Sequence, residues 1–135
     1  VEVKFRGVYG GIVGNMDNRL ANRKKEPDAV AEQRYTAPIK EVLEIYGSPK
    51  TIDYLSLDVE GSEYEIMKDF PFEEYTIKIL TVERPNKELK ELLEAKGYLE
   101  LKTLAWWGEF LWCHKSTGFT PEHPKIKKIV TEERN

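Results

Sequence analysis

The chain has 135 residues and a net charge of −3, with 21 lysines and arginines against 24 aspartates and glutamates. This balance argues against a nucleic-acid-binding protein, which usually has a clear excess of basic residues. The length suits one domain with a sizeable core, and no apolar run approaches the roughly 18 residues of a membrane span, so we expect no membrane partner. The single cysteine, Cys113, excludes an internal disulfide and fits a reducing compartment, so we expect a cytoplasmic protein.

The first part of the chain combines a short strand, a glycine-rich stretch and one well-marked helix. Residues 2–6 alternate in polarity, which predicts a strand. The glycine-rich residues 7–14 match neither G-x-G-x-x-G nor a P-loop, so we interpret them as a flexible loop whose glycines allow tight turns or close approach to a ligand. Apolar residues recur at helical spacing from Ile39 to Tyr46, and Pro38 before them suits a helix start.

A strand and a helix follow in the middle of the chain. Residues 52–57 carry apolar side chains on both faces, which predicts an interior strand of a parallel sheet. Ser62 and Glu65 have the spacing of a capping box, in which each side chain bonds the other's backbone at a helix start. The predicted helix runs to about Phe70, because Pro71 blocks its continuation.

A second strand and helix lead into a hairpin. Residues 75–82 predict a strand, residues 85–97 a helix with its inner face on leucines, and residues 98–104 and 109–114 two strands around a short turn. A strand, helix and parallel strand within about 30 residues form a crossover unit. The order from residue 52 therefore predicts an α/β domain with a mostly parallel sheet that ends in an antiparallel hairpin.

Acidic residues stand at the ends of both predicted parallel strands. Asp58 and Glu60 follow the first strand, and Glu83 with Arg84 follows the second. Ligands of open parallel sheets bind beyond the carboxyl ends of the strands, so these side chains should meet at one edge. Such a cluster can orient a hydroxyl, accept its proton or hold a metal ion. The structural alternative is that acids at strand ends only favour the N-termini of the following helices.

Other candidate sites carry weaker signals. Asp58-Val59-Glu60 could be the D-x-E metal pair of a sugar-nucleotide transferase, although three residues match often by chance. Cys113, His114 and His123 lack further ligands at zinc spacing, so we predict no zinc site.

The segment IDYLSLDVEGSE, residues 52–63, closely resembles the signature of the FkbM-type methyltransferase family. The resemblance covers about residues 2–119 and leaves residues 120–135 as a polar C-terminal extension. Further matches follow in order at Phe70-Pro71-Phe72, Thr81-Val82-Glu83-Arg84-Pro85, Leu92-Leu93, Gly97-Tyr98 and Gly108-Glu109-Phe110-Leu111-Trp112. The family implies a Rossmann-like class I fold and S-adenosylmethionine-dependent methylation, usually of hydroxyl oxygens on sugars or small natural products.

The resemblance also implies roles for particular residues. It places Asp58 and Glu60 at the end of the fourth family strand and Glu83 at the end of the fifth, as catalytic carboxylates that orient or deprotonate an acceptor hydroxyl. Positioning the acceptor oxygen for in-line displacement would supply much of the rate gain. The residues that would lie on the substrate side are Arg84 and, in the upstream segment, Gly10, Gly11, Asp17 and Asn18.

The chain departs from the family pattern near its beginning. The glycine-rich turn and the acid that hold S-adenosylmethionine are not found, and there is no initiator Met. We therefore expect residues 1–119 to be the C-terminal part of a methyltransferase domain, with no assignable cofactor residues and no metal. The alternatives are a truncated, non-catalytic domain that pairs with another protein or with itself through an exposed sheet edge, and a metal-dependent glycosyl transferase that uses Asp58 and Glu60.

Overall fold

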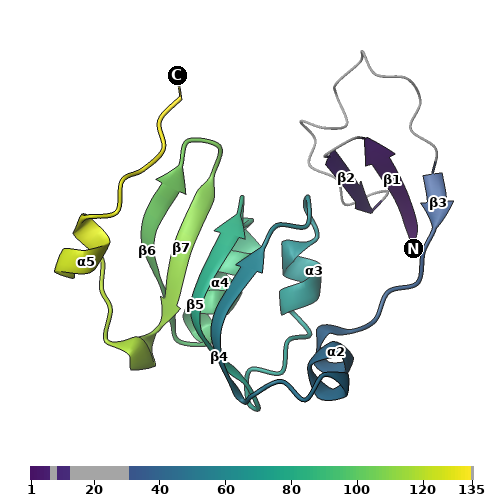
Figure 1. The fold of residues 1–135 in the computed structure, drawn as a ribbon, viewed down its shortest axis with the longest axis horizontal. Coiled ribbons are helices and arrows are strands. Elements are labelled where there is room, and N and C mark those ends of the chain that lie inside the picture. Colours follow the sequence, from purple (N-terminus) through teal and green to yellow (C-terminus); the bar gives the residue numbers. More distant parts are fainter. Residues whose placement is uncertain (7–8, 13–30, 135) are drawn as a thin grey trace.

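The computed structural model describes residues 1–6, 9–12 and 31–134, and these residues form two separate β-sheets with five helical segments (Figure 1). The first sheet has three short antiparallel strands in the order β2-β1-β3. Its strands are β1 (Glu2–Arg6), β2 (Tyr9–Ile12) and β3 (Ala31–Gln33).

The predicted strand at residues 2–6 is confirmed as β1, but the loop predicted at residues 7–14 is wrong in part. Residues 9–12 form β2, which pairs along its whole length with β1. Glycines weaken the sequence signal of a strand, yet the backbone of a neighbouring strand can still hydrogen-bond to them. The rest of that segment, Asp17 and Asn18 with it, lies outside the described residues.

The second sheet has four strands in the order β4-β5-β7-β6. They are β4 (Thr51–Leu57), β5 (Thr76–Glu83), β6 (Tyr98–Ala105) and β7 (Glu109–His114), so the predicted strands and the hairpin are confirmed. The prediction of a mostly parallel sheet is wrong here. Only β4 and β5 pair in parallel, because the hairpin folds back so that its second strand, β7, lies antiparallel beside β5.

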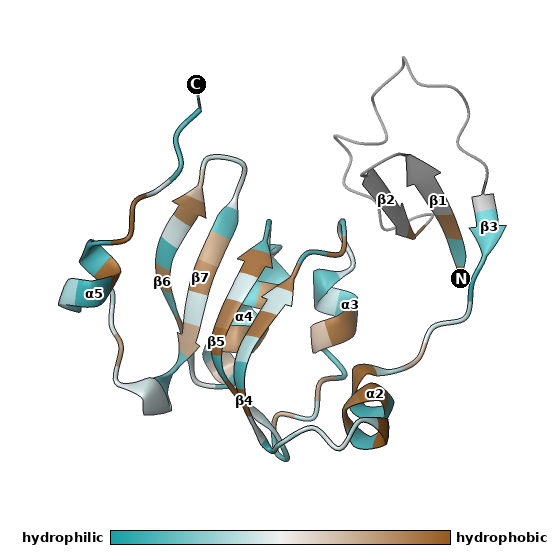
Figure 2. Cartoon of the chain, in the orientation of Figure 1, coloured by the Kyte–Doolittle hydropathy of each residue, from teal (hydrophilic) through white to brown (hydrophobic). Residues whose placement is uncertain are grey.

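β4 lies at an edge of the four-stranded sheet, so the predicted interior position for residues 52–57 is wrong within the described part of the chain. Apolar residues on both faces of a strand indicate packing above and below the sheet. They do not indicate that the strand has a neighbouring strand on each side. Leu57 is buried in the core and Leu55 packs against it, whereas Tyr54 on the opposite face is 55% exposed. The apolar residues recur along all four strands of this sheet (Figure 2).

Helices cover the sheet and connect its strands. The helix predicted after Pro38 is confirmed, although Val42 and Tyr46 of its predicted inner face are exposed. The helix predicted to reach Phe70 is shorter than expected. The helical segments are α2 (Ile39–Ile45), α3 (Glu63–Met67), α4 (Lys87–Ala95), η1 (Lys115–Thr117) and α5 (Pro124–Lys127). Among the described residues, no helix has both the length and the apolar character needed to cross a bilayer.

The four-stranded sheet has a core on each face. Alternate residues of a strand point to opposite faces, so Trp112 of β7 joins one core while Leu111 and Cys113 join the other. The larger core lies under α3 and α4, and α4 is seen behind the sheet in Figure 1. The smaller core is closed by Ile126 of α5, which is 6% exposed. The polar residues 120–135 thus contribute an apolar contact to the sheet.

Candidate active site

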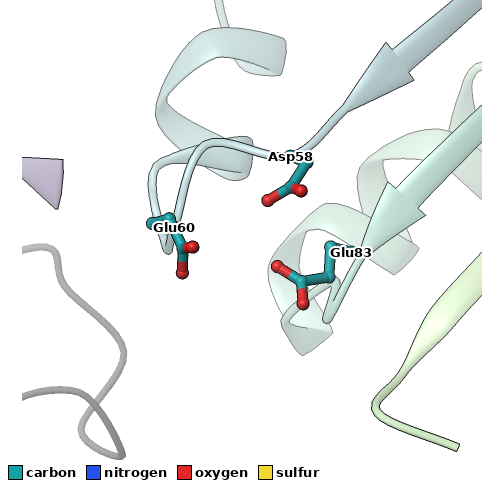
Figure 3. Close-up of side chains that lie close together, drawn as sticks. All are labelled: Asp58, Glu60 and Glu83. Carbon is teal, nitrogen blue, oxygen red and sulfur yellow. The ribbon is translucent and has the colours of Figure 1, made fainter. Parts of the chain in front are cut away.

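The site lies at the carboxyl ends of the parallel strands β4 and β5. Asp58 directly follows β4, Glu60 comes two residues later, and Glu83 is the last residue of β5. Because the strands run in parallel, their ends meet at one edge of the sheet. The structure brings the three side chains together (Figure 3), and one carboxylate oxygen from each lies within 4.8 Å of the others.

A buried carboxylate shapes the loop after β4. Glu63, at the start of α3, is 5% exposed, and its Oε1 accepts hydrogen bonds from the backbone N–H groups of Val59 and Gly61, both at 3.1 Å. Between these anchors Glu60 adopts a φ of 55°, in the left-handed region that non-glycine residues seldom enter. Glu63 therefore holds the turn that places Glu60 near Asp58.

The capping box predicted from Ser62 and Glu65 is wrong. Ser62 does occupy the N-cap position of α3, but its side chain makes no capping hydrogen bond, and its buried Oγ has no partner among the described residues. Glu65 forms an exposed ion pair with Lys68 instead. Glu63 instead accepts the backbone N–H groups of Val59 and Gly61, which lie before the helix and are not the donors of a capping box.

Arg84 is held at the end of β5 by the turn of the β6–β7 hairpin. Its backbone N–H donates to the Gly108 carbonyl at 2.8 Å, and its Nε donates to the Trp107 carbonyl at 3.0 Å. Its Nη2 lies 3.1 Å from Oε1 of Glu83. Like Glu60, Arg84 has a positive φ, of 44°. The guanidinium is thereby oriented toward the carboxylate cluster.

Glu83 has a strongly raised pKa. The pKa of this carboxyl is raised to about 7: burial contributes most, hydrogen bonding to Asp58 and the charges of Asp58 and Glu60 also raise it, and the Arg84 guanidinium opposes the rise. Negative charges this close repel one another, so one proton is retained in the cluster. Near neutral pH, Glu83 can therefore both accept and release a proton.

A fourth carboxylate, Glu109, was not among the predicted site residues. It starts β7 directly opposite Glu83. Burial raises its pKa, a hydrogen bond with Thr81 lowers it, and the charge of Asp58 raises it again. The hydroxyl of Thr81 also lies 2.7 Å from that of Tyr54. The sequence signal was the acid just after the hairpin turn, which an antiparallel partner of β5 would return to this edge.

Two of the remaining predicted residues lie away from this cluster. Gly10 and Gly11 lie in β2, in the other sheet, where they pair with β1. Asp17 and Asn18 fall outside the described residues.

The cluster has the composition of a cation site as well as that of a proton site. Asp58, Glu60 and Glu83 are the described residues that could together hold a divalent ion, because carboxylate oxygens are the ligands that Mg²⁺ and Ca²⁺ prefer. A proton shared between Glu83 and Asp58 relieves the same repulsion without a metal.

Comparison with known proteins gives one match. The family model of the methyltransferase FkbM domain matches residues 6–100, which is most of the chain and includes β4, β5 and the three carboxylates. No curated protein and no solved structure matches significantly.

Proposed function

Since this chain belongs to the methyltransferase FkbM domain family, we propose that it takes part in the transfer of a methyl group from S-adenosylmethionine to a hydroxyl oxygen of a sugar or a small natural product. The observation that carries the proposal is the cluster of Asp58, Glu60 and Glu83, in which the pKa of Glu83 is raised to about 7. A general base works best when its pKa lies near the operating pH.

Glu83 acts as the base in this proposal. S-adenosylmethionine, when bound, supplies a methyl group on a positively charged sulfur. The Glu83 carboxylate would accept the proton of the acceptor hydroxyl as its oxygen becomes methylated. Asp58 and Glu60 orient the hydroxyl, and holding the oxygen in line supplies much of the rate gain.

The charge of the site suits the cationic end of the cofactor. Three carboxylates within 4.8 Å of one another, opposed by Arg84, create a negative potential that attracts a sulfonium. The residues that would hold the ribose and the methionine part are not assigned. Arg84, fixed by Glu83 and Trp107, would face the acceptor.

The test combines binding with turnover on the full-length protein. Calorimetry should show uptake of S-adenosylmethionine, and radiolabelled methyl groups should pass to members of a panel of sugars and hydroxylated natural products. Glu83→Gln keeps the side chain's size but removes the base, so the transfer rate should fall about 100-fold or more while cofactor affinity stays close to that of the wild type. Glu94→Gln, at an exposed position of α4, is the matched control. A full rate in Glu83→Gln would contradict the assignment of the base.

The spacing of the carboxylates also supports a second function, a metal-dependent glycosyl transferase. In that case Mn²⁺ would raise the melting temperature of the wild type, and Asp58→Asn would abolish the rise. An unchanged melting temperature with Mn²⁺ argues against the metal-dependent glycosyl transferase.

The position of β4 supports a third, non-catalytic function. This strand pairs only with β5 within the described residues, so its other edge could pair with a second copy of the chain. Light scattering separates the cases, because a monomer that binds S-adenosylmethionine contradicts pairing as the function.

A further inference from the structure

The C-terminal segment is bonded to the strand that leads into the hairpin turn. The N–H of Glu132 donates to the Leu104 carbonyl at 2.7 Å, and the Glu132 carbonyl accepts the N–H of Trp106 at 2.9 Å. The Thr131 hydroxyl donates to the Thr103 carbonyl at 2.7 Å. β6 is an edge strand of its sheet, so Thr131 and Glu132 give its last residues a partner on the open side.

The same segment is anchored before it reaches the hairpin. Ile126 is buried in the smaller core, and Ile129 packs against that core. The Lys102 ammonium donates to the carbonyls of Lys127 and Ile129, so β6 also holds the backbone that precedes Thr131. The position of Glu132 is therefore set by the contacts of this segment with the sheet.

The other side of the hairpin turn holds Arg84. The carbonyls of Trp107 and Gly108 accept its Nε–H and backbone N–H. A Cβ on Gly108 would lie 3.1 Å from Cγ of Arg84, which shows how closely the turn approaches. The left-handed backbone of Arg84 is unfavourable for a residue that carries a side chain, so it needs such contacts to persist.

We propose that Thr131 and Glu132 are positioning residues for the carboxylate cluster, because they fix the hairpin turn that holds Arg84 beside Glu83. The connection runs through backbone hydrogen bonds, from Glu132 to Leu104 and Trp106 and from the adjoining turn to Arg84. Its consequence for turnover rests on the proposed function. The positioning itself does not.

The test compares two variants of Glu132 that differ in whether the backbone N–H group is kept. Glu132→Pro removes the donor to the Leu104 carbonyl, whereas Glu132→Ala keeps that donor and removes the same side-chain charge. NMR on the protein without ligands reads the outcome at Arg84. In Glu132→Pro we expect its backbone amide to exchange roughly five- to tenfold faster, the effect of losing about one hydrogen bond, and its Nε–H resonance to move. Glu132→Ala should match the wild type at both signals.

A control signal and a replacement variant complete the test. The amide of Leu80 in the middle of β5 should stay protected in every variant, which shows that the sheet is intact. If Glu132→Pro does not fold, a chain ending at Val130 replaces it, because that chain retains Ile126 and Ile129. Wild-type Arg84 signals in the folded variant overturn the proposal. Failure to bind S-adenosylmethionine would instead overturn the proposed function and leave these signals unchanged.

Discussion

The ends of β4 and β5 share a sequence pattern but are stabilised in different ways. Each strand has an acid at its end, Asp58 just after β4 and Glu83 as the last residue of β5, then a non-glycine residue with positive φ, and then a helix. After β4 the turn around Glu60 is held by Glu63, only three residues further on. After β5, Arg84 is held by Trp107 and Gly108, more than 20 residues away in the sequence.

This difference separates the local and the remote determinants of the site. The Asp58–Glu60 side depends on one short segment, which a sequence can encode by itself. The Glu83–Arg84 side depends on where the β6–β7 hairpin lies, and therefore on the sheet and the C-terminal segment that fix it. Substitutions that affect the end of β4 should therefore act from nearby in the sequence, whereas the end of β5 should also respond to substitutions in the distant hairpin.

The largest effect is expected at the local end, from Glu63→Ala. The substitution leaves the N–H groups of Val59 and Gly61 without their acceptor. Two hydrogen bonds to a buried carboxylate should cost about 3 kcal/mol of unfolding free energy, measured by urea denaturation. The control is Glu65→Ala, which removes only the exposed pair with Lys68 and should cost less than about 0.5 kcal/mol. Equal losses in the two variants would show that the β4 turn does not depend on Glu63.

The remote end should respond to Gly108→Ala with a loss of about 2 kcal/mol. Gly108 has a φ of 106°, and the new Cβ would press on Arg84. Gly118→Ala is the control, because Gly118 also has a positive φ, 72°, but has open space around it, so about 1 kcal/mol of backbone strain is expected there. A shift of the Arg84 Nε–H resonance in Gly108→Ala alone would mark the remote contact. Its absence there would mean that the turn is not coupled to Arg84.

The local features of this fold were predictable from the sequence, and the long-range ones were not. Periodicity and glycine positions located β4 to β7 and the helix after Asn86. Acids at two strand ends indicated the cluster of Asp58, Glu60 and Glu83. Glu109 was missed because its place depends on β7 becoming the antiparallel neighbour of β5, which the sequence pattern did not predict.

The wrong predictions about the sheet have the same physical origin as the missed Glu109. The edge position of β4 and the antiparallel position of β7 depend on which strands become neighbours, and strand hydrophobicity does not encode that choice. The capping box is a separate error: Ser62 leaves its bond to the helix backbone unmade, and Glu63 accepts the N–H groups of Val59 and Gly61 in the loop before the helix.

The coupling at the remote end also predicts a pH dependence of stability. The pKa of Glu83 is raised from 4.5 to about 7 on folding, so between these values the folded chain binds more proton than the unfolded chain. The unfolding free energy should therefore fall as the pH rises through this window. With allowance for solvent screening, the contribution is about 1.5 kcal/mol. Urea denaturation of wild type and Glu83→Gln across the window measures it, and the variant should lack this slope.

The smallest expected effect comes from a comparison of the N-cap residues of α4 and α3. The Asn86 side chain accepts the Leu89 N–H at 2.8 Å and caps α4, whereas Ser62 makes no such bond at α3. Asn86→Ala should therefore cost about 1 kcal/mol of unfolding free energy. Ser62→Ala should cost nothing or be slightly stabilising, because it removes a buried hydroxyl that lacks a partner. Thermal unfolding of the two variants tests this, and a loss at Ser62 as large as that at Asn86 would mean that Ser62 does cap α3 in solution, as its sequence position predicts.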